Sequence, residues 1–289
     1  MKAALLQTCI DRLHLRCGVC PHACVLRENQ RGKCGVRENQ DGIIVALNDG
    51  LAVAKAVDPI EKKPLKRFMP GTMIYSTAAA GCNLSCPWCQ NHAIVNVSPS
   101  TYYFGYPVHP EAHIVAAKKA RAKSLAMTYS EPTVALEYTQ AIFKYAKQAG
   151  LKTVFVSNGY ITLEALSLLM PWMDAANIDF KTDDDAVMQQ FGGFDSGAVL
   201  KTMRAIKDAG IHLEVTTLIV PGINDSYAAM RSMAKTFVNT VGKAVPWHVS
   251  RFFPAFKMQH VEPTSMDTLK QAKTIALAHG IQDVVLGNV

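Results

Sequence analysis

The stretch that decides the fold is "TMIYSTAAAGCNLSCPWCQN", residues 72–91. Its first half, 72–80, is a run of β-branched, aromatic and small apolar residues, which predicts a buried strand. Its second half places Cys82, Cys86 and Cys89 in a C-x3-C-x2-C pattern and offers no fourth cysteine nearby. A three-cysteine loop therefore directly follows a predicted strand.

Beyond residue 120 the chain alternates short apolar runs with segments of helical periodicity. Six more strands are predicted, at 124–130, 152–158, 175–181, 212–220, 247–253 and 283–288. Amphipathic helices are predicted at 133–149 and 265–279, and a glycine follows each of them. Repeated strand and helix units predict an α/β fold whose parallel sheet closes fully or partly into a (β/α) barrel.

Polar residues follow the predicted strands at the point where each strand ends. Since barrels of this kind carry their sites at the carboxyl ends of the strands, we expect these side chains to converge there. The residues concerned are Cys82, Cys86, Cys89, Ser130, Glu131, Asn158, Asp179, Lys181 and Arg251.

The three-cysteine loop lacks the fourth ligand that a closed metal site needs. Iron–sulfur clusters that only carry electrons take four thiolates, whereas a site that performs chemistry keeps one coordination position open. The pattern therefore favours a [4Fe-4S] cluster in which the three cysteines bind three irons and the fourth iron is left for a cofactor or substrate. A zinc site that includes His92, or a chance group of buried thiols, is the alternative.

This loop, with Trp88 before the last cysteine, resembles the radical S-adenosylmethionine (SAM) superfamily. The resemblance implies that SAM chelates the open iron and that one electron from the cluster splits SAM into methionine and a 5'-deoxyadenosyl radical, which abstracts hydrogen from a substrate. It also implies an electron donor such as flavodoxin or ferredoxin. In such enzymes the cofactor supplies the reactive chemistry, and the protein supplies orientation and exclusion of water.

The segment "TYSEPT", 128–133, is similar to the superfamily's segment after the second strand. The similarity implies that Ser130 and Glu131 receive the ammonium group of SAM. Without the resemblance, Ser130, Glu131 and Pro132 are typical of a helix start, with a capping residue, an acid and a proline in the first turn. The two interpretations are compatible.

Two later segments, "SNG" (157–159) and "DFK" (179–181), are also similar to SAM-binding segments. They imply that Asn158 and Asp179 meet the ribose and that Lys181 meets the SAM carboxylate. Asp179 and Lys181 lie two residues apart on one strand face, so a plain ion pair is the alternative.

Within the superfamily, the chain resembles the AmmeMemoRadiSam group, which is related to pyruvate formate-lyase activating enzyme. The resembling segments are "CGVCPHACVLRENQRGKCGVR", "DPIEKKPL", "LEVTTLIVPGIND", "WHVSRFFP" and the final "LGN". Phe256 stands where the activating enzymes commonly carry a histidine, and His248 on the same strand is a candidate replacement. We predict Lys181, His248 and Arg251 as catalytic residues, although a lone strand histidine is often a core residue.

The first 70 residues differ from the rest, and we predict that 1–70 form a Cys-rich module while 71–289 form the barrel. Cys17, Cys20, Cys24 and Cys34 supply four sulfurs, and His22 lies among them; this set predicts structural zinc or an auxiliary electron-relay cluster. A hairpin is predicted with its turn at 48–50, and 58–72 is the predicted linker.

Composition bounds the function classes. Eight cysteines without a secretory signal or a long apolar run predict a cytoplasmic, metal-binding or redox protein and no membrane partner. The net charge of +7 is dispersed, so nucleic acid is not the expected partner. We predict a radical SAM enzyme, related to activating enzymes, that acts on a protein, peptide or small molecule. The alternatives are a radical SAM enzyme that modifies RNA and a non-catalytic Fe–S or zinc protein for electron transfer or docking.

Overall fold

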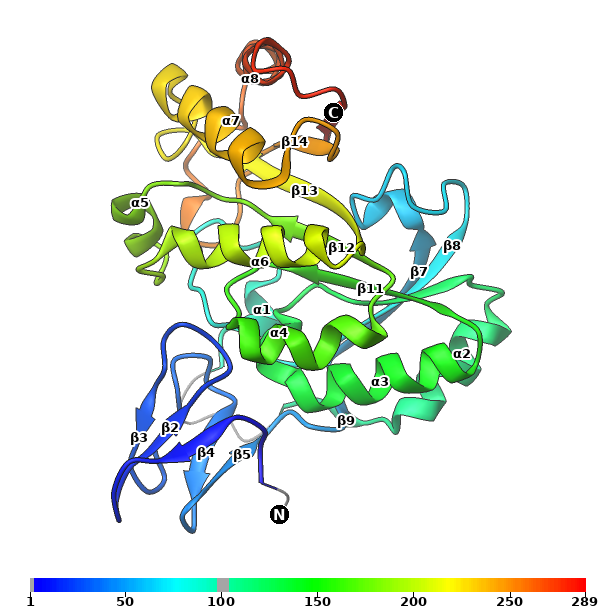
Figure 1. Ribbon diagram of the computed structural model, residues 1–289, viewed down its shortest axis with the longest axis vertical. Coiled ribbons are helices and arrows are strands. Elements are labelled where there is room, and N and C mark those ends of the chain that lie inside the picture. Colours follow the sequence, from blue (N-terminus) through cyan, green and yellow to red (C-terminus); the bar gives the residue numbers. More distant parts are fainter. Residues whose placement is uncertain (1–2, 98–103) are drawn as a thin grey trace.

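The computed structural model describes residues 3–97 and 104–289, and its centre is an eight-stranded sheet of order β15-β14-β13-β12-β11-β10-β8-β7 (Figure 1). All seven predicted strands are confirmed, and they run parallel to one another. They are β8 (Met73–Ala78), β10 (Ser124–Met127), β11 (Lys152–Ser157), β12 (Ala175–Asp179), β13 (His212–Ile219), β14 (Trp247–Arg251) and β15 (Val284–Gly287).

The barrel is partial. Among the described strands, β7 (Ala54–Pro59) and β15 form the two edges of the sheet, and β7 is antiparallel to its neighbour β8. The predicted α/β architecture is confirmed, and the choice left open between a full and a partial barrel falls to the partial one.

Helices cover the outer face of the sheet and pack side by side in chain order (Figure 1). The predicted helix at 133–149 begins with a 3₁₀ turn, η2 (Pro132–Ala135), and the helix predicted at 265–279 starts from Ser265, whose side chain accepts a hydrogen bond from the Thr268 amide. The outer helices are α2 (Pro110–Lys119), α3 (Leu136–Gln148), α4 (Leu163–Leu169), α6 (Ser196–Asp208), α7 (Tyr227–Val241) and α8 (Met266–Ala278).

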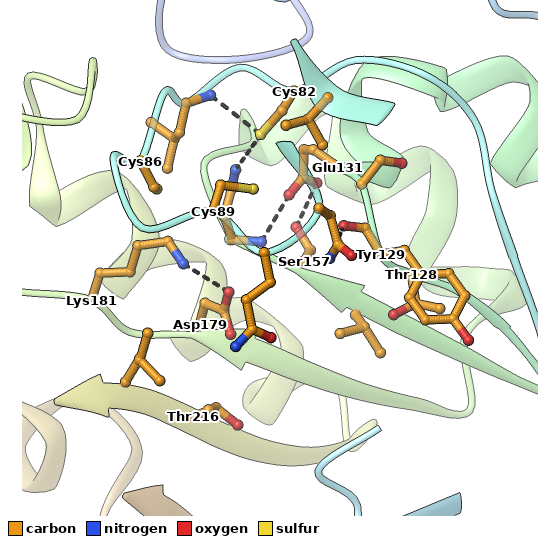
Figure 2. Close-up of a pocket in the computed structure, with 18 of the residues that line it drawn as sticks. Cys82, Cys86, Cys89, Thr128, Tyr129, Glu131, Ser157, Asp179, Lys181 and Thr216 are labelled. Carbon is orange, nitrogen blue, oxygen red and sulfur yellow. Dashed lines mark hydrogen bonds and ion pairs between the residues drawn. The ribbon is translucent and has the colours of Figure 1, made fainter. Parts of the chain in front are cut away.

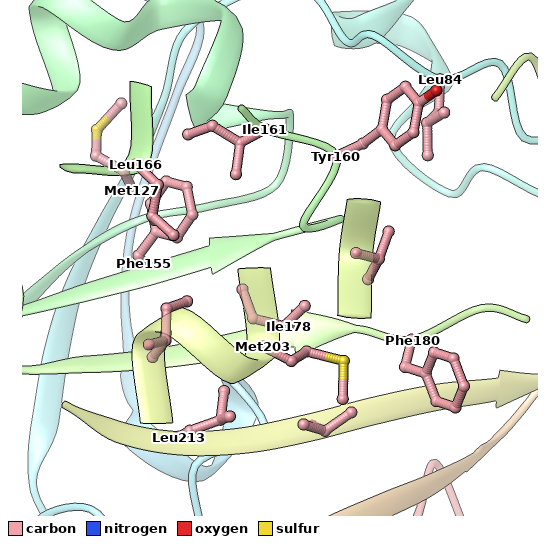
Figure 3. Packing of buried hydrophobic residues seen from close by; sticks show 14 of the residues in the cluster. Leu84, Met127, Phe155, Tyr160, Ile161, Leu166, Ile178, Phe180, Met203 and Leu213 are labelled. Atoms are coloured by element: carbon pink, nitrogen blue, oxygen red, sulfur yellow. The ribbon is translucent and has the colours of Figure 1, made fainter. Parts of the chain in front are cut away.

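The main core lies between the outer face of the sheet and these helices (Figure 3). Phe155 and Ile178 from the strands are buried with Leu166 of α4 and Met203 of α6. Burial of this apolar surface, at about 25 cal/mol per Å², is the main force that holds the helices on the sheet. The inner face of the sheet is packed by a separate group of residues.

Residues 60–67 fill the inside of the curved sheet near the amino ends of the strands. Ile60 and Leu65 are fully buried against residues from the first half of β8, β10, β11 and β12. The amides of Lys66 and Arg67 donate to the Glu214 carboxylate at 2.9 and 2.7 Å. Part of the predicted linker is therefore a packed plug near the amino ends of the strands.

The N-terminal segment forms three small sheets. β1 (Gln7–Cys9), β2 (Leu15–Cys17) and β3 (Val25–Leu26) form one, β4 (Arg37–Gln40) pairs with β5 (Ile43–Ala46), and β6 (Leu51–Ala52) pairs with β9 (Tyr106–Pro107).

Two sequence expectations for this region need correction. The strands on either side of the 48–50 turn do not pair with each other, because β5 pairs with β4 and β6 with β9. The division at residue 70 is also misplaced, because β7 and the 60–67 plug belong to the large sheet and its interior.

In the described ranges, none of the helices combines the length and the apolar character that crossing a bilayer requires.

Candidate functional site

The cysteine loop lies at the carboxyl end of β8 and ends at the short helix α1 (His92–Val95). It begins at Gly81, whose φ of +99° is open to glycine and whose added Cβ would lie 2.8 Å from a Val36 methyl group. The amide of Ser85 donates to the Phe191 carbonyl at 2.8 Å, and the buried Trp88 ring packs edge-on against Phe191. The loop is thus fixed at both its start and its middle.

The environment of the thiols fits cluster ligands. The Leu84 amide and the Asn158 side-chain amide lie 3.4 and 3.7 Å from Cys82 Sγ, as N–H donors to sulfur. Burial raises the pKa of Cys86 to about 11 and that of Cys82 well above its usual value. Three sulfurs on one loop match three irons of a cubane cluster. Binding of the deprotonated sulfurs to iron would offset the cost of burying their charge.

Glu131 connects the ends of β10 and β11. Its Oε1 accepts from the Thr133 amide at 2.9 Å and from Ser157 Oγ at 2.7 Å, and its Oε2 accepts from the Asn158 amide at 2.8 Å. The side chain is buried, and this burial raises its pKa although the hydrogen bonds act in the opposite direction. A 3₁₀ turn starts here, but its cap is Glu131 and not Ser130, which was the capping residue of the alternative interpretation; Ser130 Oγ instead donates to the Ala79 carbonyl.

Asp179 and Lys181 form an ion pair beside the cysteine loop, with Lys181 Nζ 2.8 Å from Asp179 Oδ2. Burial alone would lower the pKa of Lys181, but the negative Asp179 and the nearby Cys86 raise it above its usual value. The ammonium therefore stays charged. The ion pair that was considered as the alternative to SAM binding by these two residues exists, and both residues line a cavity.

One cavity of about 350 Å³ joins these groups. It is lined by all three loop cysteines and by every predicted SAM-binding residue, and Figure 2 shows the Asp179–Lys181 pair and the Glu131 network facing the cysteine loop. These residues are Cys82, Cys86, Cys89, Ser130, Glu131, Asn158, Asp179 and Lys181.

His248 and Arg251 are not among the described residues that line this cavity. His248 is buried, and its Nε2 lies 2.6 Å from Glu214 Oε2, while Arg251 Nε donates to the Thr264 carbonyl at 2.7 Å. Burial would raise the pKa of Glu214, but hydrogen bonds from His212, His248 and the plug amides outweigh it and hold that pKa at about 2. The structure thus places both residues outside the cavity that holds the other predicted site residues, and their catalytic roles stay a prediction.

Lys63 and Tyr129, which sequence reasoning did not single out, form another wall of the cavity, and both are bonded to Asp58. Tyr129 Oη donates to Asp58 Oδ2 at 3.1 Å and accepts from Lys63 Nζ at 2.9 Å, and the same Nζ lies 4.3 Å from the centroid of the Tyr129 ring. Tyr129 has a φ of +67°, a conformation that costs a non-glycine residue about 1–3 kcal/mol and is typical of functional sites. No local sequence pattern signals this conformation at a tyrosine.

The four N-terminal cysteines surround a second cavity of about 10 Å³, together with His22 and Arg37. Within 3–97 and 104–289, no three or more His, Cys, Asp or Glu side chains already stand in an arrangement that would hold a metal ion, and this applies to the loop cysteines as well as to the N-terminal set. Metal binding at either set would thus include side-chain adjustment of the thiols.

Comparison with known proteins places the chain in a family. The model of the radical SAM superfamily matches residues 77–234. An uncharacterized protein of Methanocaldococcus jannaschii is 36% identical over 289 residues, covering 100% of this chain and 86% of the relative. The isethionate sulfite-lyase activating enzyme of Nitratidesulfovibrio vulgaris is 26% identical over 106 residues, which are 36% of this chain and 34% of that enzyme.

Solved structures agree on the fold. A radical SAM methyltransferase from Sphaerobacter thermophilus matches with a TM-score of 0.59 at 15% identity, over 76% of this chain and 67% of the other. The match to the superfamily model begins at the end of β8 and includes the cysteine loop and the ends of β10, β11, β12 and β13 at the large cavity. The chain therefore belongs to the radical SAM superfamily, whose members use a [4Fe-4S] cluster and SAM and need an electron donor.

Proposed function

We propose that this protein is an enzyme that reductively cleaves SAM and abstracts hydrogen from a protein, peptide or small-molecule substrate, in the manner of the activating enzymes. The observation that carries the proposal is the shared cavity, in which the three-cysteine loop faces the Asp179–Lys181 pair and Glu131. When bound, the cluster and SAM supply the electron and the 5'-deoxyadenosyl radical. The chain's own residues bind and orient SAM and exclude water.

Glu131 is suited to receive the ammonium group of SAM. An ionised carboxylate has about four acceptor positions, and protein donors occupy two on Oε1 and one on Oε2. The remaining acceptor position is on Oε2, and Glu131 lines the cavity. A cation bound there would favour the ionised form of Glu131, against the burial that raises its pKa.

Lys181 is suited to bind the SAM carboxylate, and Asp179 to bind ribose hydroxyls. Only one of the three ammonium hydrogens is required by the bond to Asp179 Oδ2, so two remain for a second carboxylate. Asn158 is assigned to the ribose with Asp179; it lines the same cavity, and its side-chain amide contacts Asn83 Oδ1 and Cys82 Sγ. We therefore propose Lys181 and Asp179 as the principal anchors, with Ser130 and Asn158 completing the pocket.

The wall formed by Lys63 and Tyr129, both bonded to Asp58, is proposed as the substrate-facing side of the cavity. Its polar groups are not needed for the SAM contacts assigned above, and backbone strain at Tyr129 is retained at a position where glycine would relieve it. Flavodoxin or ferredoxin is proposed as the electron donor.

The subgroup is also a proposal. The N-terminal cysteine pattern and the segments "DPIEKKPL" and "WHVSRFFP" support membership of the AmmeMemoRadiSam group, and the local likeness to an activating enzyme supports the related chemistry. A role as a glycyl-radical activase has less support, because Phe256 stands where the activating enzymes commonly carry a histidine. In the structure the Phe256 ring stacks on His92 with the ring centroids 4.8 Å apart.

The test is release of 5'-deoxyadenosine. Anaerobically reconstituted protein, reduced with dithionite and given SAM, is expected to form 5'-deoxyadenosine and methionine in equal amounts, measured by mass spectrometry. Reduced flavodoxin is expected to replace dithionite as the electron source. If the reduced cluster is confirmed and no 5'-deoxyadenosine forms with either reductant, the proposed function is wrong.

A further inference from the structure

The second cysteine set is built from a tightly turned segment of the chain. The Cys17 amide donates to the Cys24 carbonyl at 2.9 Å, and the Ala23 amide donates to the Cys20 carbonyl at 3.1 Å, so β2 and the following turn bring three of the cysteines together. Cys34 arrives from the turn before β4 and is buried, as is Cys17. With the thiols in their present positions their common cavity of about 10 Å³ holds one small atom, and a four-iron cluster would require a larger side-chain adjustment than a zinc ion.

Two buried nitrogen atoms beside these cysteines have no hydrogen-bond partner. Arg37 is 2% exposed and pairs with Glu137 through Nη2 at 2.6 Å, yet its Nε–H has no acceptor among the described residues. His22 Nε2 lies 2.8 Å from the Asn83 carbonyl oxygen, which can only accept. In the neutral ring Nδ1 then carries the lone pair, and this atom is buried without a partner as well. Both residues line the cavity.

These atoms match a sulfur-bound metal centre. Buried polar atoms normally have partners, so an unpaired donor and an unpaired lone pair on one cavity call for an occupant. Four thiolates and a divalent ion, or four thiolates and a [4Fe-4S]²⁺ core, carry a net charge of about −2. The Arg37 guanidinium would offset part of that charge and donate Nε–H to sulfur, while soft sulfur donors exclude calcium and magnesium.

We propose that Cys17, Cys20, Cys24 and Cys34 bind a second, thiolate-ligated metal centre, either one zinc ion or one iron–sulfur cluster, with His22 as an alternative fourth ligand. On binding, each ligating thiol releases its proton to solvent. The centre is separate from the cluster of the 82–89 loop.

The position of this centre ties it to the large cavity. His22 follows Cys20 by two residues and donates to the carbonyl of Asn83, the neighbour of Cys82. Asn83 in turn accepts from Asn158, which lines the large cavity. His22 therefore links the N-terminal cysteine segment to the cysteine loop at Asn83.

The experiment begins with a variant that lacks the loop cluster. In a Cys82→Ala, Cys86→Ala, Cys89→Ala background, any tightly bound thiophilic metal must come from the N-terminal set, so the result does not depend on SAM chemistry. Protein purified anaerobically with zinc and iron in the medium is expected to hold about one zinc, or about four irons and four sulfides, per chain. Finding zinc identifies a single ion, and finding iron with sulfide identifies a cluster.

Further variants assign the metal. Adding Cys20→Ser and Cys34→Ser to the background is expected to lower the metal content at least about tenfold, because two of four ligands are lost. Cys9→Ser is the matched control, since Cys9 is an exposed cysteine of the same segment that does not line the cavity, and it is expected to retain the metal.

A spectroscopic measurement does not depend on whether the Cys20→Ser and Cys34→Ser variant folds, because it uses the background variant that keeps all four N-terminal cysteines. X-ray absorption at the zinc or iron edge, on the background variant with an intact N-terminal segment, is expected to show sulfur neighbours at about 2.3 Å. A background variant that is folded by circular dichroism but carries no bound metal would overturn the proposal. A metal shell without sulfur would overturn it equally.

Discussion

Replacing Cys82, Cys86 and Cys89 together by alanine is expected to lower the iron and sulfide content by about four atoms each per chain and to reduce SAM cleavage to background. The thiols are the cluster ligands of this account, and alanine supplies none. The fold is expected to persist, because the loop is held by backbone bonds such as Ser85 N to Phe191 O, which alanine preserves. Iron and sulfide analysis with the 5'-deoxyadenosine assay measures both effects.

Cys9→Ala is the control for this variant, because Cys9 is exposed and lies outside both cavities. It is expected to keep the wild-type iron content and SAM cleavage. Wild-type iron and turnover in the triple variant would show that the cluster is held elsewhere.

Lys181→Ala is expected to weaken SAM binding by about 30- to 1000-fold while the cluster content stays unchanged. A charge-assisted bond in a site shielded from water contributes on the order of 2–4 kcal/mol, which corresponds to that range. The substitution also leaves Asp179 without its cation, which disfavours the approach of the SAM carboxylate. Equilibrium binding of SAM to protein of equal iron content is the measurement.

Lys152→Ala is the matched control for Lys181→Ala. Lys152 also forms an ion pair, with Asp174 at 3.0 Å, but it lies at the start of β11 and so at the opposite end of the strands. SAM affinity is expected to be unchanged in this variant. Equal SAM affinity in Lys181→Ala and wild type would exclude the proposed role of Lys181.

The barrel was predictable from sequence because its strands are buried on both sides and appear as apolar runs separated by helical periodicity. The small N-terminal sheets were not, because strands of two to four residues pair according to tertiary contacts that leave little local signal. β7 is a separate case: it follows the 48–50 turn, which favoured a hairpin, yet its partner is β8. The packed plug was likewise hidden, since the three prolines of residues 58–72 are equally typical of a linker.

The candidate site was largely predictable because its residues follow strand ends in a parallel sheet. His248 lies outside the cavity because alternation gives the face of a strand and not the depth along it. Ser250 on the same strand lines the cavity, while His248, two residues or about 7 Å earlier, reaches Glu214 near the plug. Tyr129 was missed because a left-handed conformation at a tyrosine has no sequence signature.

The central claim is that SAM binds beside the cluster of the 82–89 loop, and electron paramagnetic resonance of the reduced cluster tests it most directly. The account predicts that adding SAM to reduced wild-type protein changes the g-values of the cluster signal, and that Lys181→Ala requires a much higher SAM concentration for the same change. A wild-type signal that stays identical at saturating SAM, with the cluster assigned to Cys82, Cys86 and Cys89, would contradict the account.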